Sequence, residues 1–170
     1  MQPEETLNRL KKSQAFKQWI EGSNGNAESY LAHCFVMYDG QKENEWQFGY
    51  YVPCRDRIVT FNVSREISVG PESEIFKEGE NALDKLEIGN VNIDARDAID
   101  SARKLQEQKY PMDKPQKTIL ILQSIGGEPI YNITFVTAVF NTLNIKVNAK
   151  SGEVISDKIS SIMSLGKFDK

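Results

Sequence analysis

The sequence predicts an α+β fold made of two tandem units, each a helix packed on an antiparallel sheet of three to four strands. Two observations predict this fold. Each half of the 170-residue chain begins with a helical pattern and continues with segments in which apolar and polar residues alternate. These segments also follow the same order in both halves. We therefore expect one unit over residues 1–80 and a second over residues 91–170.

The composition is that of a chain able to bury a core, with 39% hydrophobic and 26% charged residues. The net charge is -3 and the 21 basic residues are dispersed, which argues against nucleic acid as a partner. A secretory signal has a positively charged segment followed by an apolar one, and the N-terminal residues do not show this pattern. No apolar run approaches the roughly 20 residues that span a bilayer. These features predict a cytoplasmic protein with no membrane partner.

The first unit is expected to begin with a helical segment over residues 4–20. Its apolar residues do not fall on one face, so we expect a break near Ser13, whose hydroxyl would cap a second helical piece. Alternation of apolar and polar residues then predicts three strands, at residues 31–37, 46–52 and 59–63. The charged segment 72–76 is the candidate for a fourth strand.

The pairing of the first two strands follows from where their hairpin loop lies. If residues 39–44 form the loop, Phe35 faces Phe48 and Met37 faces Trp46, so the apolar faces of both strands coincide. This register places Phe35 and Met37 in the core of the first unit.

The second unit begins with a clearer helix. Asp94 is the expected N-cap of this helix. The apolar residues that follow it recur at helical spacing: Ala95, Ala98, Ile99, Ala102 and Leu105. Pro111 marks the end of the helix. The pair Gly126–Gly127 permits a tight hairpin turn between two of the strands that follow. Those strands are predicted near residues 118–122, 131–135, 143–147 and 153–155.

The two halves can be aligned with each other. Residues 45–50 match residues 130–135, and residues 59–63 match residues 143–147. Each matched stretch lies behind a helix and one earlier strand. The repeated order predicts a duplication, with the polar segment 68–90 at the junction.

Residues 147–154, which read Val-Asn-Ala-Lys-Ser-Gly-Glu-Val, resemble the PepSY domain. That family ends a strand with an aspartate, where Asn148 stands here, and then places a turn with a glycine and an acidic residue. The resemblance covers residues 91–156, and the first half joins it through internal similarity alone. It implies a cystatin-like fold for each unit and a non-catalytic role: inhibiting or regulating proteases and binding partners at the cell envelope.

Catalytic chemistry finds little support in the sequence. His33 and Cys34 are adjacent, but neighbouring side chains on a strand point to opposite faces, which excludes a nucleophile–base pair. His33 is the one histidine of the chain, so a histidine-based metal site or a Ser-His-Asp triad would depend on it alone. We predict no catalytic site, no metal and no cofactor.

Cys54 is the candidate reactive thiol, because Arg55 and Arg57 follow it and cationic neighbours favour the thiolate. An enzyme or redox protein using Cys54 is therefore one alternative function. A set of acidic residues lacks the spacing of a calcium loop and is interpreted as a solvated edge: Glu72, Glu74, Glu78 and Glu80.

The aromatic residues carry the main functional hint. In the predicted register Tyr30, Tyr38 and Tyr51 point away from the core of the first unit. They could form a patch for a partner protein, a homodimer contact or the contact between the two units. We therefore predict a non-enzymatic protein-binding or regulatory module. A carrier with a small-ligand cavity between helix and sheet is the other alternative.

Overall fold

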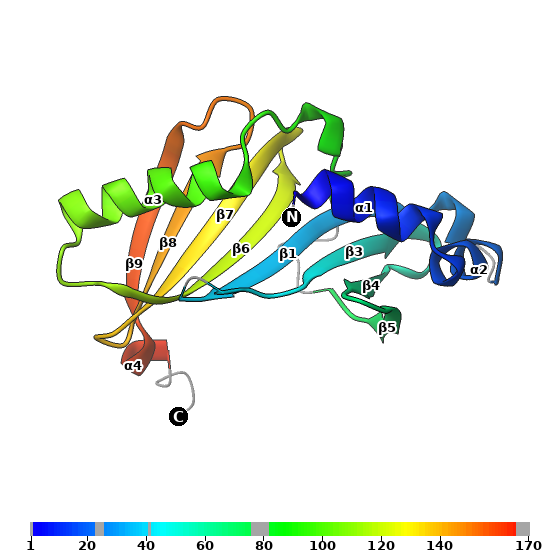
Figure 1. Cartoon of the computed structure of the whole chain (residues 1–170), viewed down its shortest axis with the longest axis horizontal. Helices are drawn as coiled ribbons and strands as arrows, with labels where there is room; N and C mark the ends of the chain where they lie inside the picture. The colour runs from blue at the N-terminus through cyan, green and yellow to red at the C-terminus, as the bar shows by residue number, and fades with distance from the viewer. Residues whose placement is uncertain (1, 23–25, 41, 76–81, 166–170) are drawn as a thin grey trace.

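The computed structural model describes residues 2–22, 26–40, 42–75 and 82–165, and its main feature is one large antiparallel sheet (Figure 1). Within these residues the strands are β1 (Tyr30–Asp39), β2 (Lys42–Glu43), β3 (Trp46–Val52), β4 (Arg57–Val63), β5 (Ile67–Ser73), β6 (Pro115–Ile125), β7 (Glu128–Thr137), β8 (Asn141–Asn148) and β9 (Val154–Ser161). Their order across the sheet is β5-β4-β3-β1-β6-β7-β8-β9, and β2 pairs with β1.

The prediction of two tandem cystatin-like units is wrong, because the strands of both halves form a single sheet. Strands β1 and β6 pair in antiparallel fashion from His33 opposite Gln123 to Asp39 opposite Lys117. In two separate sheets both strands would be edges with unpaired backbone groups. Their pairing satisfies these groups and leaves β5 and β9 at the two ends of the sheet. The molecule is therefore dominated by its sheet rather than by helix-on-sheet units.

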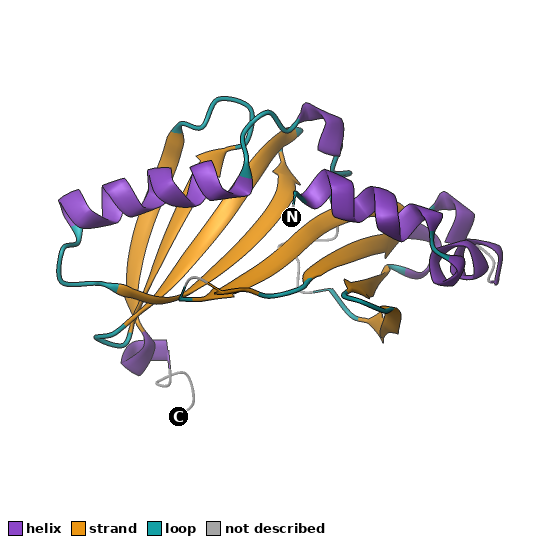
Figure 2. Ribbon diagram, in the orientation of Figure 1, coloured by secondary structure: helices purple, strands orange, loops and turns teal. Residues whose placement is uncertain are grey.

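Three helices cross one face of this sheet, as Figure 2 shows. They are α1 (Pro3–Lys12), α2 (Gln14–Gly22) and α3 (Ala95–Lys109); shorter helical segments are α4 (Ile162–Leu165), η1 (Asn26–Glu28), η2 (Pro53–Arg55) and η3 (Ile88–Asn90). The predicted break at Ser13 is confirmed, since its hydroxyl accepts a hydrogen bond from the Phe16 amide at 3.2 Å. The predicted N-cap is confirmed as well, because the Asp94 carboxylate accepts from the Arg96 amide at 3.0 Å.

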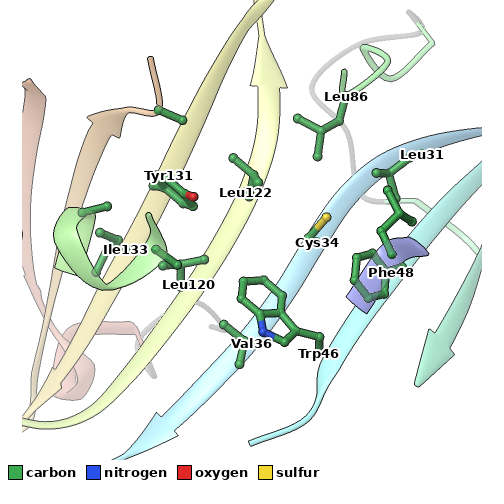
Figure 3. Packing of buried hydrophobic residues seen from close by; sticks show 14 of the residues in the cluster. Leu31, Cys34, Val36, Trp46, Phe48, Leu86, Leu120, Leu122, Tyr131 and Ile133 are labelled. Carbon is green, nitrogen blue, oxygen red and sulfur yellow. The ribbon is translucent and has the colours of Figure 1, made fainter. Parts of the chain in front are cut away.

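The main core lies between these helices and the sheet, and both halves of the chain contribute to it. Figure 3 shows side chains that meet there from neighbouring strands and from one loop: Leu31, Cys34, Val36, Trp46, Phe48, Leu86, Leu120, Leu122, Tyr131 and Ile133. At one end, Phe16 of α2 packs its ring 5.0 Å from that of Tyr50 and 5.3 Å from that of Phe61. A core shared in this way holds the two halves together as one body.

The register of β1 differs from the predicted one by one residue. Cys34, not Phe35, lies opposite Phe48, and the pairing shifts between Leu31 and His33. The hairpin is tighter than expected, because Tyr38 lies opposite Glu43 of β2. A slip of one residue moves every side chain of a strand to the other face of the sheet. Phe35 and Met37 therefore point away from the helices. The predicted register, which placed both side chains in the core, is wrong for them.

Candidate functional site on the open face of the sheet

The face of the sheet opposite α1, α2 and α3, here called the open face, carries a group of apolar side chains at its centre. Phe35 and Met37 of β1 pair with Ile121 and Ile119 of β6. Each of the four is half-buried. We call these four residues the apolar strip. They lie at the junction of the two halves, on strands that are paired on both sides.

A hollow of about 500 Å³ adjoins the apolar strip on its β3 side. Phe35, Met37 and Gln47 line its floor on the open face, and residues 42–45 of the β1–β3 hairpin form the rest. Its size falls within the range of roughly 300–1,000 Å³ that is common for binding pockets. The hollow gives the open face a recess in which an apolar or amide-bearing group could be held.

His33 lies on the open face next to the apolar strip and covers Gly49 of β3. A Cβ atom built on Gly49 would come within 2.2 Å of the His33 ring, so only glycine leaves room for the imidazole there. Burial lowers the pKa of His33, which keeps the ring neutral near pH 7. His33 therefore adds a flat, uncharged surface beside the apolar strip.

Polar side chains continue the open face over the second half. The Asn144 side-chain amide donates to Asn132 Oδ1 at 2.6 Å and to Thr134 Oγ1 at 2.9 Å. These bonds join β7 to β8 and fix the orientation of the groups. The open face thus combines an apolar centre with pre-oriented amides and hydroxyls.

The structure does not bring the three predicted tyrosines together. Tyr30 and Tyr51 lie opposite each other at one end of the open face, with ring centroids 5.4 Å apart. Ile75 and Leu83 pack against the cluster to which they belong, and the Tyr30 hydroxyl donates to the Leu83 carbonyl at 2.7 Å. Tyr38 lies on the other face, within the main core. Ile75 and Leu83 thus lie against the pair, and Tyr38 faces the helices.

Cys54 is exposed and lies in η2. The guanidinium of Arg55 lies 4.0 Å from its Sγ, but it also forms an ion pair with Glu72 and donates to Asn26 Oδ1 at 2.6 Å. The positive charge beside Cys54 is therefore shared with a carboxylate. The role of Cys54 as a reactive thiol stays a prediction.

The remaining residues that the sequence singled out are Cys34 and the acidic residues of the predicted solvated edge. Cys34 is fully buried among the helix-facing core residues, and burial raises the pKa of its thiol. Glu72 pairs with Arg55, and Glu74 pairs with Arg57 at 3.3 Å; Glu78 and Glu80 lie outside the described residues. Across the described ranges, no three His, Cys, Asp or Glu side chains are grouped as a metal ion would need.

Hollows also lie on the helix side of the sheet, where the sequence had suggested a ligand cavity. Three of them, in the part of the chain that the structure describes, have volumes of about 240, 250 and 300 Å³. They lie at or below the lower end of the usual range for drug-sized ligands, roughly 300 Å³. The alternative of a carrier for a small ligand stays a prediction.

Comparison with known proteins identifies the fold but no family. No protein-family model and no curated protein matches the chain. A solved crystal structure of a "putative lipoprotein" from Clostridium difficile 630 is similar, with a TM-score of 0.57 and 13% sequence identity. The match covers 94% of this chain and 93% of that one. The likeness shows that the single-sheet architecture occurs in a second protein, and the PepSY resemblance stays a prediction.

None of the described helices is long and apolar enough to cross a membrane.

Sequence reasoning missed the apolar strip because it assigned Phe35 and Met37 to the core. One signal pointed to it. Residues 119–122 are apolar at four consecutive positions, so this strand presents apolar side chains on both faces. An edge strand of a small sheet with one solvent-exposed face would be expected to alternate apolar and polar residues. Four consecutive apolar residues are instead typical of a central strand that has contacts on both faces.

Proposed function

We propose that this protein is a non-enzymatic binding module that holds a protein partner on the open face of its sheet. The observation that carries the proposal is the apolar strip, Phe35, Met37, Ile119 and Ile121, which faces away from the helices at the centre of the sheet. Contiguous apolar side chains on an outer surface are typical of protein interaction sites.

The surroundings of the apolar strip support this role. The polar residues beside it on the neighbouring strands include the amides Gln47, Gln123 and Asn132, and His33 is neutral, whereas the adjoining hollow is lined by charged residues of the hairpin: Lys42, Glu43 and Glu45. Protein interfaces have few charges at their centre and place polar groups around an apolar core. A partner would therefore bury the strip at the centre of the contact and meet Lys42, Glu43 and Glu45 at its edge.

The rigidity of the site also favours a binding role. All four residues of the apolar strip lie on β1 and β6, which are paired with each other and with β3 and β7. Side chains on paired strands lose little backbone freedom on binding, so more of the contact energy appears as affinity. This arrangement suits a recognition surface better than a moving catalytic loop.

The PepSY resemblance adds a candidate for the class of partner. It implies regulation of proteases or binding of partners at the cell envelope, and the similar solved structure is that of a "putative lipoprotein". Both favour an envelope location over the cytoplasmic location predicted from the N-terminus. Fractionation of cells that produce the native full-length protein distinguishes the two locations.

Site-specific photo-cross-linking tests the proposal. A benzoyl-phenylalanine at Phe35 should form an adduct with a second protein in cells, and the Ile121→Lys substitution should abolish the adduct. The matched control carries the cross-linker at Lys104, which is exposed on α3. An adduct with twice the mass of this chain would identify a homodimer instead of another partner. Equal adducts from both positions, or none from Phe35, would contradict a binding site on the open face.

A further inference from the structure

A group of exposed apolar side chains lies at one end of the sheet, where β7 turns into β8 and α4 follows β9. Val139 and Phe140 lie in that turn, and Ile162 and Met163 lie in α4. The Ile162 amide donates to the Phe140 carbonyl at 2.9 Å, and Figure 1 shows α4 beside the turn at the lower end of the sheet. Phe140 and Met163 are 67% and 77% exposed. We call these four residues the apolar tip.

Phe140 holds a backbone conformation that is unusual for its side chain. Its φ angle is 59°, in the left-handed region where glycine and asparagine are common and an aromatic residue is disfavoured. Burial of the ring does not offset this cost, because most of the side chain is exposed. Strained residues cluster at functional sites. The fold gains little from an aromatic ring at this position, which points to a task for the ring outside the fold.

The turn that carries Phe140 is held firmly by a buried carboxylate. Asp113 accepts hydrogen bonds from the Asn141 side-chain amide at 2.7 Å and from the Thr137 hydroxyl at 3.4 Å. The Thr137 hydroxyl in turn accepts from the Asn141 backbone amide at 3.1 Å. Both residues that flank the turn are thus tied to the loop before β6. The apolar tip is therefore presented by a fixed turn, so its contacts cost little ordering of the backbone.

The segments that form the apolar tip carry no charge. Residues 129–145 and 159–165 contain no acidic or basic side chain, and serine, threonine and asparagine stand between the apolar residues. Lys114 lies beside the turn, because its carbonyl accepts from the Ala138 amide at 3.1 Å, and its side chain is exposed. A lysine in this place can keep its ammonium in water, or on a lipid phosphate, while the neighbouring apolar groups are buried.

We propose that the apolar tip inserts into the interface of a lipid bilayer. A protein contact of standard size takes roughly 20–30 residues from each partner, whereas the apolar tip offers four large side chains at the end of the molecule. A bilayer requires no complementary shape and accepts a few apolar side chains while hydroxyls and amides stay among its headgroups. The sequence predicted no membrane partner because it lacks a spanning segment, but a surface contact needs none. The contact is independent of the proposed partner surface, which lies at the centre of the sheet.

Broadening of NMR signals by a spin-labelled lipid tests the contact. Bicelles of phosphatidylcholine that carry the labelled lipid are added to the full chain labelled with nitrogen-15. The amide signals of Val139, Phe140 and Met163 should broaden, and that of Ile125 should not. Ile125 is the internal control, because it is 41% exposed and lies at the opposite end of β7, beside the turn to β6.

A substitution that suits the turn separates lipid contact from folding. Phe140→Asn removes the ring, and asparagine adopts the left-handed conformation more readily than phenylalanine. Broadening at Val139 and Met163 should therefore fall about fivefold or more, whereas urea unfolding should show no loss of stability. The matched control is Ile125→Asn, which removes an exposed apolar side chain at the other end of β7 and should change the broadening less than about twofold.

Three results would overturn the proposal. One is an apolar tip whose signals broaden no more than that of Ile125, which would show random collision with lipid or no contact. Another is broadening that stays unchanged in Phe140→Asn. The third is a shift of the same signals with protein concentration in the absence of lipid, which would make the apolar tip a contact between copies of this chain.

Discussion

The two faces of the sheet are built from the same strands but differ in what their side chains do. On the helix-covered face the inward positions are apolar and almost fully buried, as with Phe48, Leu120 and Ile133. On the open face the apolar residues form the apolar strip at the centre and a second cluster around Tyr30 and Tyr51 at one end, and polar side chains such as Gln47, Gln123 and Asn132 lie beside the strip. The covered face therefore supplies most of the folding free energy, and the open face keeps apolar surface that folding leaves partly exposed.

The largest expected effect comes from matched phenylalanine substitutions on the two faces. Phe48→Ala should lower the free energy of unfolding by about 3–5 kcal/mol, because it leaves a cavity beneath the helices. Phe35→Ala, on the neighbouring strand, should cost about 1 kcal/mol, because its side chain is only half-buried. Urea unfolding followed by circular dichroism measures both. Equal losses would show that the open face is as much a part of the core as the covered one.

A smaller effect is expected from Gly49→Ala on the open face. The added Cβ would lie 2.2 Å from the His33 ring and force it aside, which should cost about 1–3 kcal/mol of stability. If the clash with the ring is the cause, His33→Ala should remove most of that cost in the double variant. A double-mutant cycle on urea unfolding gives the coupling. Additive losses would mean that the backbone of Gly49, and not the imidazole, sets the requirement.

The helices could be predicted from the sequence because their signals are local. Asp94 caps α3, and the break at Ser13 separates α1 from α2, both as expected. The apolar residues at helical spacing are buried where α3 meets the sheet, including Ala98 and Ala102. Capping and periodicity act within a few residues, so one sequence is enough to read them.

The register of β1 and the union of the two halves could not be predicted, because they depend on residues far apart in the chain. Strand β1 has apolar residues at almost every position, so alternation does not choose between its faces. The choice is made by pairing with β6, which lies about 85 residues further along the chain, and by the bulge near His33. The candidate site was missed for the same reason, since Phe35 and Met37 change faces when the register shifts by one.

The smallest expected effect is a pH dependence that belongs to the open face alone. Burial lowers the pKa of His33 below its ordinary value of 6.5, so the unfolded chain binds a proton more readily than the folded one. Stability should therefore be constant above about pH 6.5 as far as His33 is concerned, and should fall as the pH drops below that value. Urea unfolding at pH 5.5 and 7.5 measures the difference.

The control for this effect is His33→Gln, which keeps a polar side chain of similar length but cannot be protonated. In this variant the loss of stability between pH 7.5 and 5.5 should become smaller, because the remaining titrating groups are carboxylates that respond mainly at lower pH. Asp157 is one of them, since hydrogen bonds from Lys109 and Tyr110 lower its pKa and its contribution is lost only in more acidic solution. An unchanged pH response in His33→Gln would mean that the imidazole is hydrated in the folded state. The neutral surface that we assign to the open face would then be charged in mild acid, and partner binding there would have to tolerate that charge.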